Sequence, residues 1–211
     1  MLNTVVEYCD GDRIEVDIPV NFSFKEGEID TGYVIENTVI GQYVRIPSGY
    51  IPDGKYVRGF WISRYEISKG KDGLPLSVAN AVPWTRISWY DAEKVAQSVN
   101  GYMPGGDEYN RICMWLVETG TASFKDVFVT KGGKGNYSNP FVMAKTGSNP
   151  EWMVNHLDNF FGNCFIWTSE KSELNSSHYI IRGGNEHHPA CRFWAKPNTK
   201  SENIGMRIVI R

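Results

Sequence analysis

The segment from Arg182 to Trp194, RGGNEHHPACRFW, carries the side chains with the widest range of chemistry in the chain. His187, His188 and Cys191 are of the types that bind metals, exchange protons or act as nucleophiles. Neighbouring side chains of an extended segment point to opposite sides, so two adjacent histidines are poorly placed to bind one metal ion. We therefore predict a solvated loop here, with ligand contact or acid–base work as the alternative, and no metal site.

Cysteine spacing gives little support for a thiol-based site. None of Cys9, Cys113, Cys164 and Cys191 forms a CxxC pair, and only the last has a histidine nearby, three residues before it. Closely spaced cysteines and histidines are the usual signature of a zinc site. The first residues show no apolar run of the kind found in signal peptides, and disulfides are rare in reducing compartments. We expect free thiols, three of them buried.

Other catalytic signatures are missing from the sequence, which contains no GxSxG, HExxH or GxxxxGK[ST] motif. The segment KGGKGNYS, residues 131–138, lacks the flanking strand and helix of a phosphate-binding loop, so we interpret it as a flexible loop. Two acidic pairs, at 91/93 and 107/108, stand at expected helix starts, where carboxylates suit the helix dipole. We therefore predict no catalytic residue and no cofactor.

Residues 185–203, NEHHPACRFWAKPNTKSEN, have the composition of a recognition surface. Two aromatic residues stand among Asn, His, Lys, Ser and Thr, a mixture typical of antibody binding loops. Loops on a rigid scaffold are also where recognition concentrates. The predicted ligand-binding residues are Asn185, His187, His188, Phe193, Trp194, Lys196 and Asn198. The alternative is that the two aromatic residues only cover the edge of a sheet.

The segments that position these residues predict an α+β fold. Residues 1–40 alternate polar and apolar side chains in short runs, which is typical of strands and turns. Two helical patterns follow, then a long irregular stretch rich in Gly and Asn over about 121–160, and then a tail of strand-like runs. A helix with one apolar face needs a cover, so we expect two helices beside an antiparallel sheet, with long irregular loops.

Both helices are marked by apolar residues at helical spacing. The two stripes are Ala92, Val95, Ala96 and Val99 in the first, and Tyr109, Ile112, Cys113 and Leu116 in the second. We expect Ser88 and Asp107 to cap the two N-termini. We expect Gly101 and Gly120 to follow the last turns.

Composition excludes several classes of protein. The chain has 211 residues, 41% of them hydrophobic and 13% aromatic, which is enough for a sizeable core and excludes disorder. A formal net charge of -2 and the lack of a basic cluster argue against binding to nucleic acid or an anionic membrane. No run approaches the roughly 20 apolar residues of a membrane span, so we expect no membrane insertion.

Six segments, in order from about Tyr43 to Arg211, resemble the formylglycine-generating-enzyme-sulfatase family, whose fold is a variant of the C-type lectin. They are YVRIPSGYI, GFWISRYEIS, VPWTRISWYDAEKVAQ, YMPGGDEYNRIC, LDNFFGNCFIWTSE, and IIRGG followed by IGMRIVIR. The stretch LPLSVANAVPWTRIS looks most like phage-encoded members, and the chain is similar to retroelement-diversified variable proteins. The resemblance implies core positions for Trp89, Trp115 and Trp167, and a buried hydrogen-bonding role for Arg182.

Two departures from the family bear on chemistry. Formylglycine-generating enzymes bind copper with two cysteines after the R-G-G turn, whereas here only Cys191 follows it. One thiolate cannot supply the two-sulfur coordination that Cu(I) prefers, and a mixed site with His188 is the alternative. The family's acidic calcium-binding position is Ile166, whose alkyl group cannot coordinate a hard cation. We expect Asn163 to be a turn residue that bonds backbone.

We therefore expect a β-rich appendage over residues 1–40, which serves attachment or assembly, and a C-type-lectin-like domain over 41–211. The resemblance implies a non-enzymatic phage virion protein, in tail fibre, baseplate or capsid, that binds a host receptor or carbohydrate with its C-terminal face. Expected partners are that receptor or glycan, other virion proteins and further copies of the chain, with no nucleic acid. The alternatives are a structural decoration or connector protein, and a divergent copper or other metal oxidase.

Overall fold

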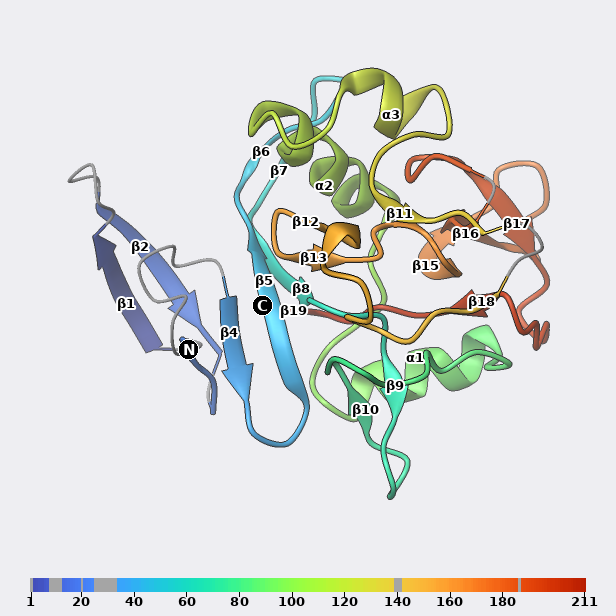
Figure 1. Cartoon of the computed structure of the whole chain (residues 1–211), viewed down its shortest axis with the longest axis horizontal. Coiled ribbons are helices and arrows are strands. Elements are labelled where there is room, and N and C mark those ends of the chain that lie inside the picture. Colours follow the sequence, from blue (N-terminus) through green and yellow to red (C-terminus); the bar gives the residue numbers. More distant parts are fainter. Residues whose placement is uncertain (1, 8–12, 20, 25–33, 139–141, 186) are drawn as a thin grey trace.

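The structure is a computed structural model that describes all residues except 1, 8–12, 20, 25–33, 139–141 and 186. Its helices are α1 (Trp89–Gln97), α2 (Gly106–Glu118), α3 (Phe124–Phe128) and the 3-10 helix η2 (Pro150–Trp152). Figure 1 shows α2 and α3 on one side of the strands at the centre of the molecule and α1 on the other. Among the described residues, no helix is long and apolar enough to cross a membrane.

The central sheet has five strands in the order β19, β8, β5, β4, β3, and every neighbouring pair is antiparallel. These strands span Val209–Ile210, Phe60–Ser63, Gly41–Ile46, Val34–Asn37 and Ser23–Phe24. Successive side chains of a strand point to opposite faces. In β8, Phe60 and Ile62 pack on the side of α2, and Trp61 packs on the side of α1. The sheet is therefore buried on both faces.

The second sheet has four strands in the order β17, β16, β15, β18, which span Phe193–Ala195, Tyr179–Gly183, Phe165–Lys171 and Ile204–Gly205. Its β15–β18 pair is parallel, so the sheet is mixed at that edge and not purely antiparallel as expected. Short two-stranded pairs complete the fold: β1 (Leu2–Glu7) with β2 (Arg13–Ile18), β6 (Gly49–Tyr50) with β7 (Tyr56–Val57), β9 (Ser68–Lys69) with β10 (Pro75–Leu76), β11 (Gly135–Asn136) with β14 (Phe161–Gly162), and β12 (Met153–Val154) with β13 (Leu157–Asp158).

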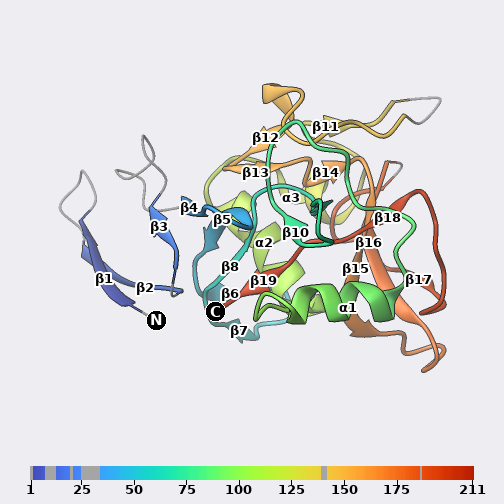
Figure 2. The same ribbon diagram turned by 90° about the horizontal axis from the view of Figure 1, so that it is seen from below.

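Two apolar clusters hold the helices on the sheets. The first, here called the α2 core, contains Tyr109, Ile112 and Leu116 of α2. The second, the α1 core, contains Ala92 and Ala96 of α1 together with aromatic residues of both sheets. The predicted stripes therefore face the two sides of the same β layer. Figure 2 shows α1 along one side of the molecule, where the Trp89 indole N–H donates to the Thr168 carbonyl of β15 at 2.8 Å.

The helix caps are partly as predicted. The Ser88 side chain accepts a hydrogen bond from the backbone N–H of Asp91 at 3.2 Å and caps α1. Asp107 does not cap α2, because it lies inside the first turn and Gly105 holds the cap position. Here the Glu108 carboxylate accepts the Gly105 N–H at 2.8 Å.

The stretch 121–160 contains more regular structure than the sequence pattern indicates. Helix α3 begins after Ser123, whose hydroxyl accepts the N–H of Asp126 at 3.1 Å while the Asp126 carboxylate accepts the N–H of Ser123. A serine followed three residues later by an acidic residue is a capping signal. That signal is present in the sequence, but the helix is a single turn and a half with one buried residue, Val127, and has no apolar stripe to mark it.

The central sheet begins earlier in the chain than the expected domain boundary at residue 41. Strand β4 pairs along its whole length with β5, and its residues Val34 and Ile35 are fully buried. By contrast, β1 and β2 form a hairpin ladder with each other and with no other strand in the described part of the chain. The part of residues 1–40 that stands apart as a separate sheet is thus the β1–β2 hairpin.

Candidate functional site

Strand β17 lies at the edge of the second sheet and carries the two predicted aromatic anchors. Among the described strands it pairs only with β16, with Phe193 opposite Ile181 and Trp194 opposite Ile180. The Phe193 side chain is 39% exposed and the Trp194 side chain is 56% exposed. Because consecutive residues of a strand point to opposite faces, the two rings belong to different sides of the sheet.

Phe193 joins an aromatic cluster on the side of the α1 core. The centroids of the Phe193 and His187 rings are 4.2 Å apart, and each ring lies 5.7 Å from that of Phe165. The turn that brings His187 here needs glycine at Gly184, where φ is +89° and a Cβ atom would lie 2.8 Å from the Phe165 ring. His187 is therefore an aromatic neighbour of Phe193 within the predicted surface.

Trp194 extends from the other face of the strand edge. Its indole contacts the His178 ring edge-on, with centroids 4.9 Å apart, and leaves more than half of its surface open. Arg192, two residues earlier, bonds Glu170 at 2.6 Å and Glu173 at 3.1 Å. This side of β17 thus presents one exposed indole beside a network of ion pairs.

The other predicted ligand-binding residues divide into two groups. His188 contacts the Val127 carbonyl through Nδ1 at 3.1 Å, and the amide of Asn185 donates to the Ser138 carbonyl at 3.1 Å. Both side chains hold neighbouring loops in place. Lys196 and Asn198 are exposed in the turn that follows β17. His187 and Phe193 thus lie together, and Trp194 lies on the opposite face of the strand. The side chains of His188 and Asn185 contact backbone carbonyls of neighbouring loops.

The described cysteines, Cys113, Cys164 and Cys191, are free and buried, as predicted, and Cys9 lies outside the described residues. The Cys191 thiol donates to the Gly183 carbonyl at 3.4 Å. Burial raises its pKa to about 11, and burial raises the pKa of Cys113 to about 12. Thiolates are the forms that bind metals and attack electrophiles, so neither group is activated in this structure.

No group of three or more His, Cys, Asp or Glu side chains that could hold a metal ion occurs in the described part of the chain. Asn163 is a turn residue that bonds backbone, as predicted. Ile166 is buried in the α2 core. Asn163 has φ of +53°, and its side-chain oxygen accepts bonds from Asn136 at 2.9 Å and from the Ala144 N–H at 3.0 Å.

The predicted structural roles of the large buried side chains are also confirmed. Trp89, Trp115 and Trp167 are buried in the two cores. The Arg182 guanidinium is 2% exposed and donates to Glu170 at 2.8 Å and to the Ala190 carbonyl at 3.0 Å. It fixes the turn before the recognition surface and takes no part in an open site.

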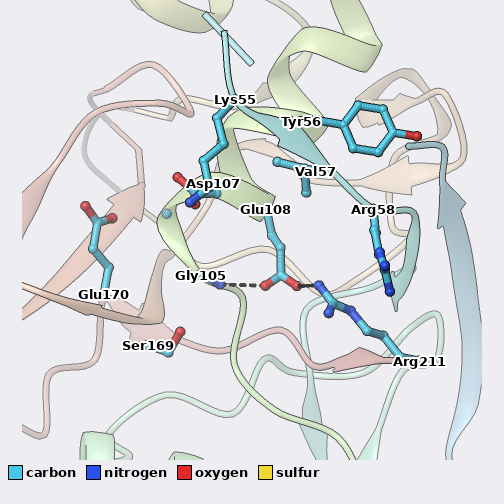
Figure 3. A pocket seen from close by; sticks show the side chains of 11 residues that line it. Lys55, Tyr56, Val57, Arg58, Gly105, Asp107, Glu108, Ser169, Glu170 and Arg211 are labelled. Atoms are coloured by element: carbon cyan, nitrogen blue, oxygen red, sulfur yellow. Dashed lines mark hydrogen bonds and ion pairs between the residues drawn. The ribbon is translucent and has the colours of Figure 1, made fainter. Parts of the chain in front are cut away.

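A pocket that no sequence pattern indicates lies between the β6–β7 hairpin and the start of α2 (Figure 3). Its volume is about 510 Å³. The lining residues are Lys55, Tyr56, Val57, Arg58, Gly105, Gly106, Asp107, Glu108, Ser169, Glu170 and Arg211. They come from four segments far apart in the chain, so no local motif marks them.

Comparisons with known proteins establish the fold. No family model matches the sequence, and no curated protein matches it. PvdO from Pseudomonas aeruginosa is similar in structure, with a TM-score of 0.58 and 16% identity over 84% of this chain and 97% of that one. CarF has a TM-score of 0.58 and 14% identity over 79% of this chain and 97% of its own. Treponema denticola variable protein 1 has a TM-score of 0.55 and 11% identity over 81% and 95%.

These likenesses confirm the predicted α+β fold of the C-type-lectin-like kind, in the form found in formylglycine-generating enzymes. The alignments cover nearly the whole of each matched chain. At such low identity these similarities show the fold alone, so the function has to be argued from the surface residues of this chain.

Proposed function

We propose that this chain is a non-enzymatic binding protein that recognises a host-cell receptor or carbohydrate through β17 and the loops beside it. The observation that carries the proposal is the pair of exposed aromatic rings, Phe193 and Trp194, on a strand held by a buried sheet. Rigid aromatic groups provide large contact areas at low cost in conformational entropy. Energetic hot spots of interfaces are enriched in such residues.

Trp194 is the stronger candidate anchor of the two. Phe193 already contacts the rings of Phe165 and His187, whereas Trp194 has one ring neighbour within the described part of the chain, His178. A saccharide face or a receptor pocket placed on the indole would bury its open surface. Lys196 and Asn198, exposed in the next turn, would then supply hydrogen bonds that orient the ligand.

Display on a phage virion, with other virion proteins and further copies of the chain as partners, is the finer part of the proposal. It is supported by the resemblance of LPLSVANAVPWTRIS to phage-encoded sequences and by the separate β1–β2 hairpin. A two-stranded hairpin is marginal on its own in water, so a partner surface is expected to cover it. Tail or capsid genes beside the coding sequence would support this location, and their absence would favour a cellular binding protein.

The binding surface is tested with the Trp194→Ala variant. Loss of the indole is expected to weaken binding to the recognised glycan or host cell about thirty-fold, which corresponds to about 2 kcal/mol. The melting temperature is expected to change little, because an exposed ring contributes little to the core. Glycan-array and cell-binding assays, with thermal melting of the same samples, measure both effects. A folded Trp194→Ala protein that binds like the parent would contradict the proposal.

Two further variants separate recognition from folding in the same assays. Phe124→Ala removes an aromatic side chain that is 50% exposed on α3, away from β17, and is expected to bind like the parent. His188→Ala removes the contact to the Val127 carbonyl that ties α3 to this loop. It is expected to lower the melting temperature, with affinity reduced only through stability. Direct loss of binding in folded His188→Ala would place that side chain in the site.

The oxidase alternative makes a distinct prediction. Burial raises the pKa of both Cys113 and Cys191, so both thiols stay protonated and neither is prepared to bind copper. We expect the purified protein, supplied with copper, to form no formylglycine in a sulfatase-type peptide, as measured by mass spectrometry. Formylglycine that disappears in both Cys113→Ser and Cys191→Ser would establish a two-thiol copper enzyme instead.

A further inference from the structure

Most charged side chains that line the pocket at the start of α2 form ion pairs with a side chain of opposite charge. Lys55 bonds Asp107, and Arg211 bonds Glu108 at 2.7 Å. Glu108 also accepts the Tyr102 hydroxyl at 2.6 Å. Each acidic side chain from the first turn of α2 thus has a cation beside it.

The third carboxylate of the lining, that of Glu170, is also neutralised. It bonds Arg182 at 2.8 Å and Arg192 at 2.6 Å. Gly106 allows this arrangement, because a Cβ atom there would lie 2.5 Å from a Glu170 oxygen. Every carboxylate in the pocket is therefore engaged, and the acidic side chains give it no free negative charge.

Arg58 is the charged side chain of the pocket lining that has no partner of opposite charge among the described residues. Within the described residues it has no hydrogen bond or ion pair, and its side chain is exposed at the pocket. Figure 3 shows its guanidinium pointing toward the side where Arg211 and Glu108 lie. A guanidinium presents several N–H donors in a planar fork that matches carboxylate and phosphate groups. The pocket therefore has one unmatched positive charge with the geometry to bind an oxyanion.

The rest of the lining suits a ligand larger than an inorganic ion. A volume of about 510 Å³ is within the usual range for small-molecule sites. Tyr56 belongs to the lining and is 54% exposed; its ring points away from Glu108 (Figure 3) and its centroid lies 5.3 Å from that of Tyr50, so aromatic surface stands at the rim of the pocket. The Ser169 hydroxyl is exposed on the opposite wall. An aromatic face and hydroxyl partners are the groups that bind hydroxylated rings.

We propose that this pocket binds a small hydroxylated organic anion, a carboxylate or phosphate ester of monosaccharide size, with Arg58 as its charge partner. This site is distinct from the β17 surface and does not depend on the function proposed for it. The two regions share only Glu170, which bonds Arg192 next to β17 and forms part of the pocket wall.

The test is a calorimetric titration of the full chain with glucuronate, glucose 6-phosphate and neutral glucose. We expect the two anions to bind and glucose to give no measurable heat. Their relative affinities distinguish a carboxylate ligand from a phosphate ligand. Binding is expected to weaken as salt is added, because the attraction is between exposed charges. Glucose binding as tightly as glucuronate, or no binding of either anion at millimolar concentration, would refute the proposal.

Three variants test whether Arg58 is the residue that binds the anion. Arg58→Gln is expected to weaken anion binding about tenfold or more, the usual size for a lost hydrogen bond to a charged group. Arg58→Lys keeps the charge but lacks the planar fork, so it is expected to weaken anion binding, though less than Arg58→Gln does. Arg86→Gln is the matched control, because Arg86 is an exposed arginine paired with Glu202 elsewhere on the surface. Unchanged binding by folded Arg58→Gln would overturn the assignment.

The same titrations separate this proposal from that for the β17 surface. Trp194→Ala is expected to bind glucuronate like the parent, and Arg58→Gln is expected to keep glycan-array or cell binding. Loss of anion binding in Trp194→Ala would show that the anion sits at β17 and would remove the pocket from consideration. The two proposals can therefore be refuted independently of each other.

Discussion

Removing residues 1–37 is expected to unfold the protein, whereas removing residues 1–18 is expected to leave it folded. The longer deletion takes away β4, whose Val34 and Ile35 side chains are fully buried in the two cores. Loss of a buried aliphatic side chain typically costs about 2–5 kcal/mol, so two such losses approach the whole stability of a domain. The shorter deletion removes only the β1–β2 hairpin, whose two strands pair with each other and with no other described strand. Circular dichroism melting measures both outcomes.

A pair of point variants gives the same comparison without changing chain length. Val34→Ala is expected to destabilise the protein by about 2 kcal/mol or more, because it leaves a cavity in the α2 core. Val39→Ala, at a side chain that is 58% exposed, is expected to change stability by less than about 0.5 kcal/mol. If deletion of residues 1–18 unfolds the domain, the hairpin belongs to the core. If it reduces only self-association or virion assembly, the hairpin is the attachment element.

Stability is expected to fall as pH rises between about pH 5 and pH 7, because of Glu66. Complete burial raises the pKa of this carboxyl from 4.5 to about 7, against the charge of Arg207 and hydrogen bonds from Cys164 and Asn163. The folded protein therefore holds a proton that the unfolded chain releases above pH 4.5. A shift of this size corresponds to about 3 kcal/mol of stability, present at low pH and lost as pH rises through the folded pKa.

The Glu66→Gln variant is the test, with urea unfolding measured across this pH range. An amide does not titrate, so the variant is expected to lose most of the dependence on pH, whatever its stability at one pH. A smaller slope of the same sign is expected to remain, because burial also raises the pKa of Asp158. An unchanged slope in Glu66→Gln would show that another group binds the proton.

Local patterns predicted helices α1 and α2 correctly, and the limits of such patterns explain what was missed. The stripes of α1 and α2 repeat within one helix, so sequence spacing alone identifies them. The separation of Phe193 and Trp194 onto different faces follows from alternation in a strand, but only once residues 193–195 are known to pair with β16. Composition indicated an aromatic recognition surface and could not indicate which side of a sheet each ring occupies.

The pocket and the buried Glu66 network depend on contacts between distant segments. Glu66 meets Cys164, 98 residues later, through a hydrogen bond from the thiol at 2.9 Å. Arg58 follows β7 and Arg211 follows β19, in distant parts of the chain, and both line one pocket. No periodicity connects such positions, so a single sequence gives no signal for them. Asp107 illustrates the same limit, since its partner Lys55 lies 52 residues away.

The order of strands in the central sheet also bears on when the protein folds during synthesis. Strand β19, at Val209–Ile210, pairs with β8, about 150 residues earlier, and the Arg207 guanidinium donates to the Ser63 and Arg64 carbonyls at 3.0 and 3.1 Å. Pairings between such distant segments slow folding, because a long loop has to close before the contacts form. The sheet cannot be completed until residues 207–210 have left the ribosome. Until then β8 has an open edge, which exposes the nascent chain to pairing with a neighbouring chain.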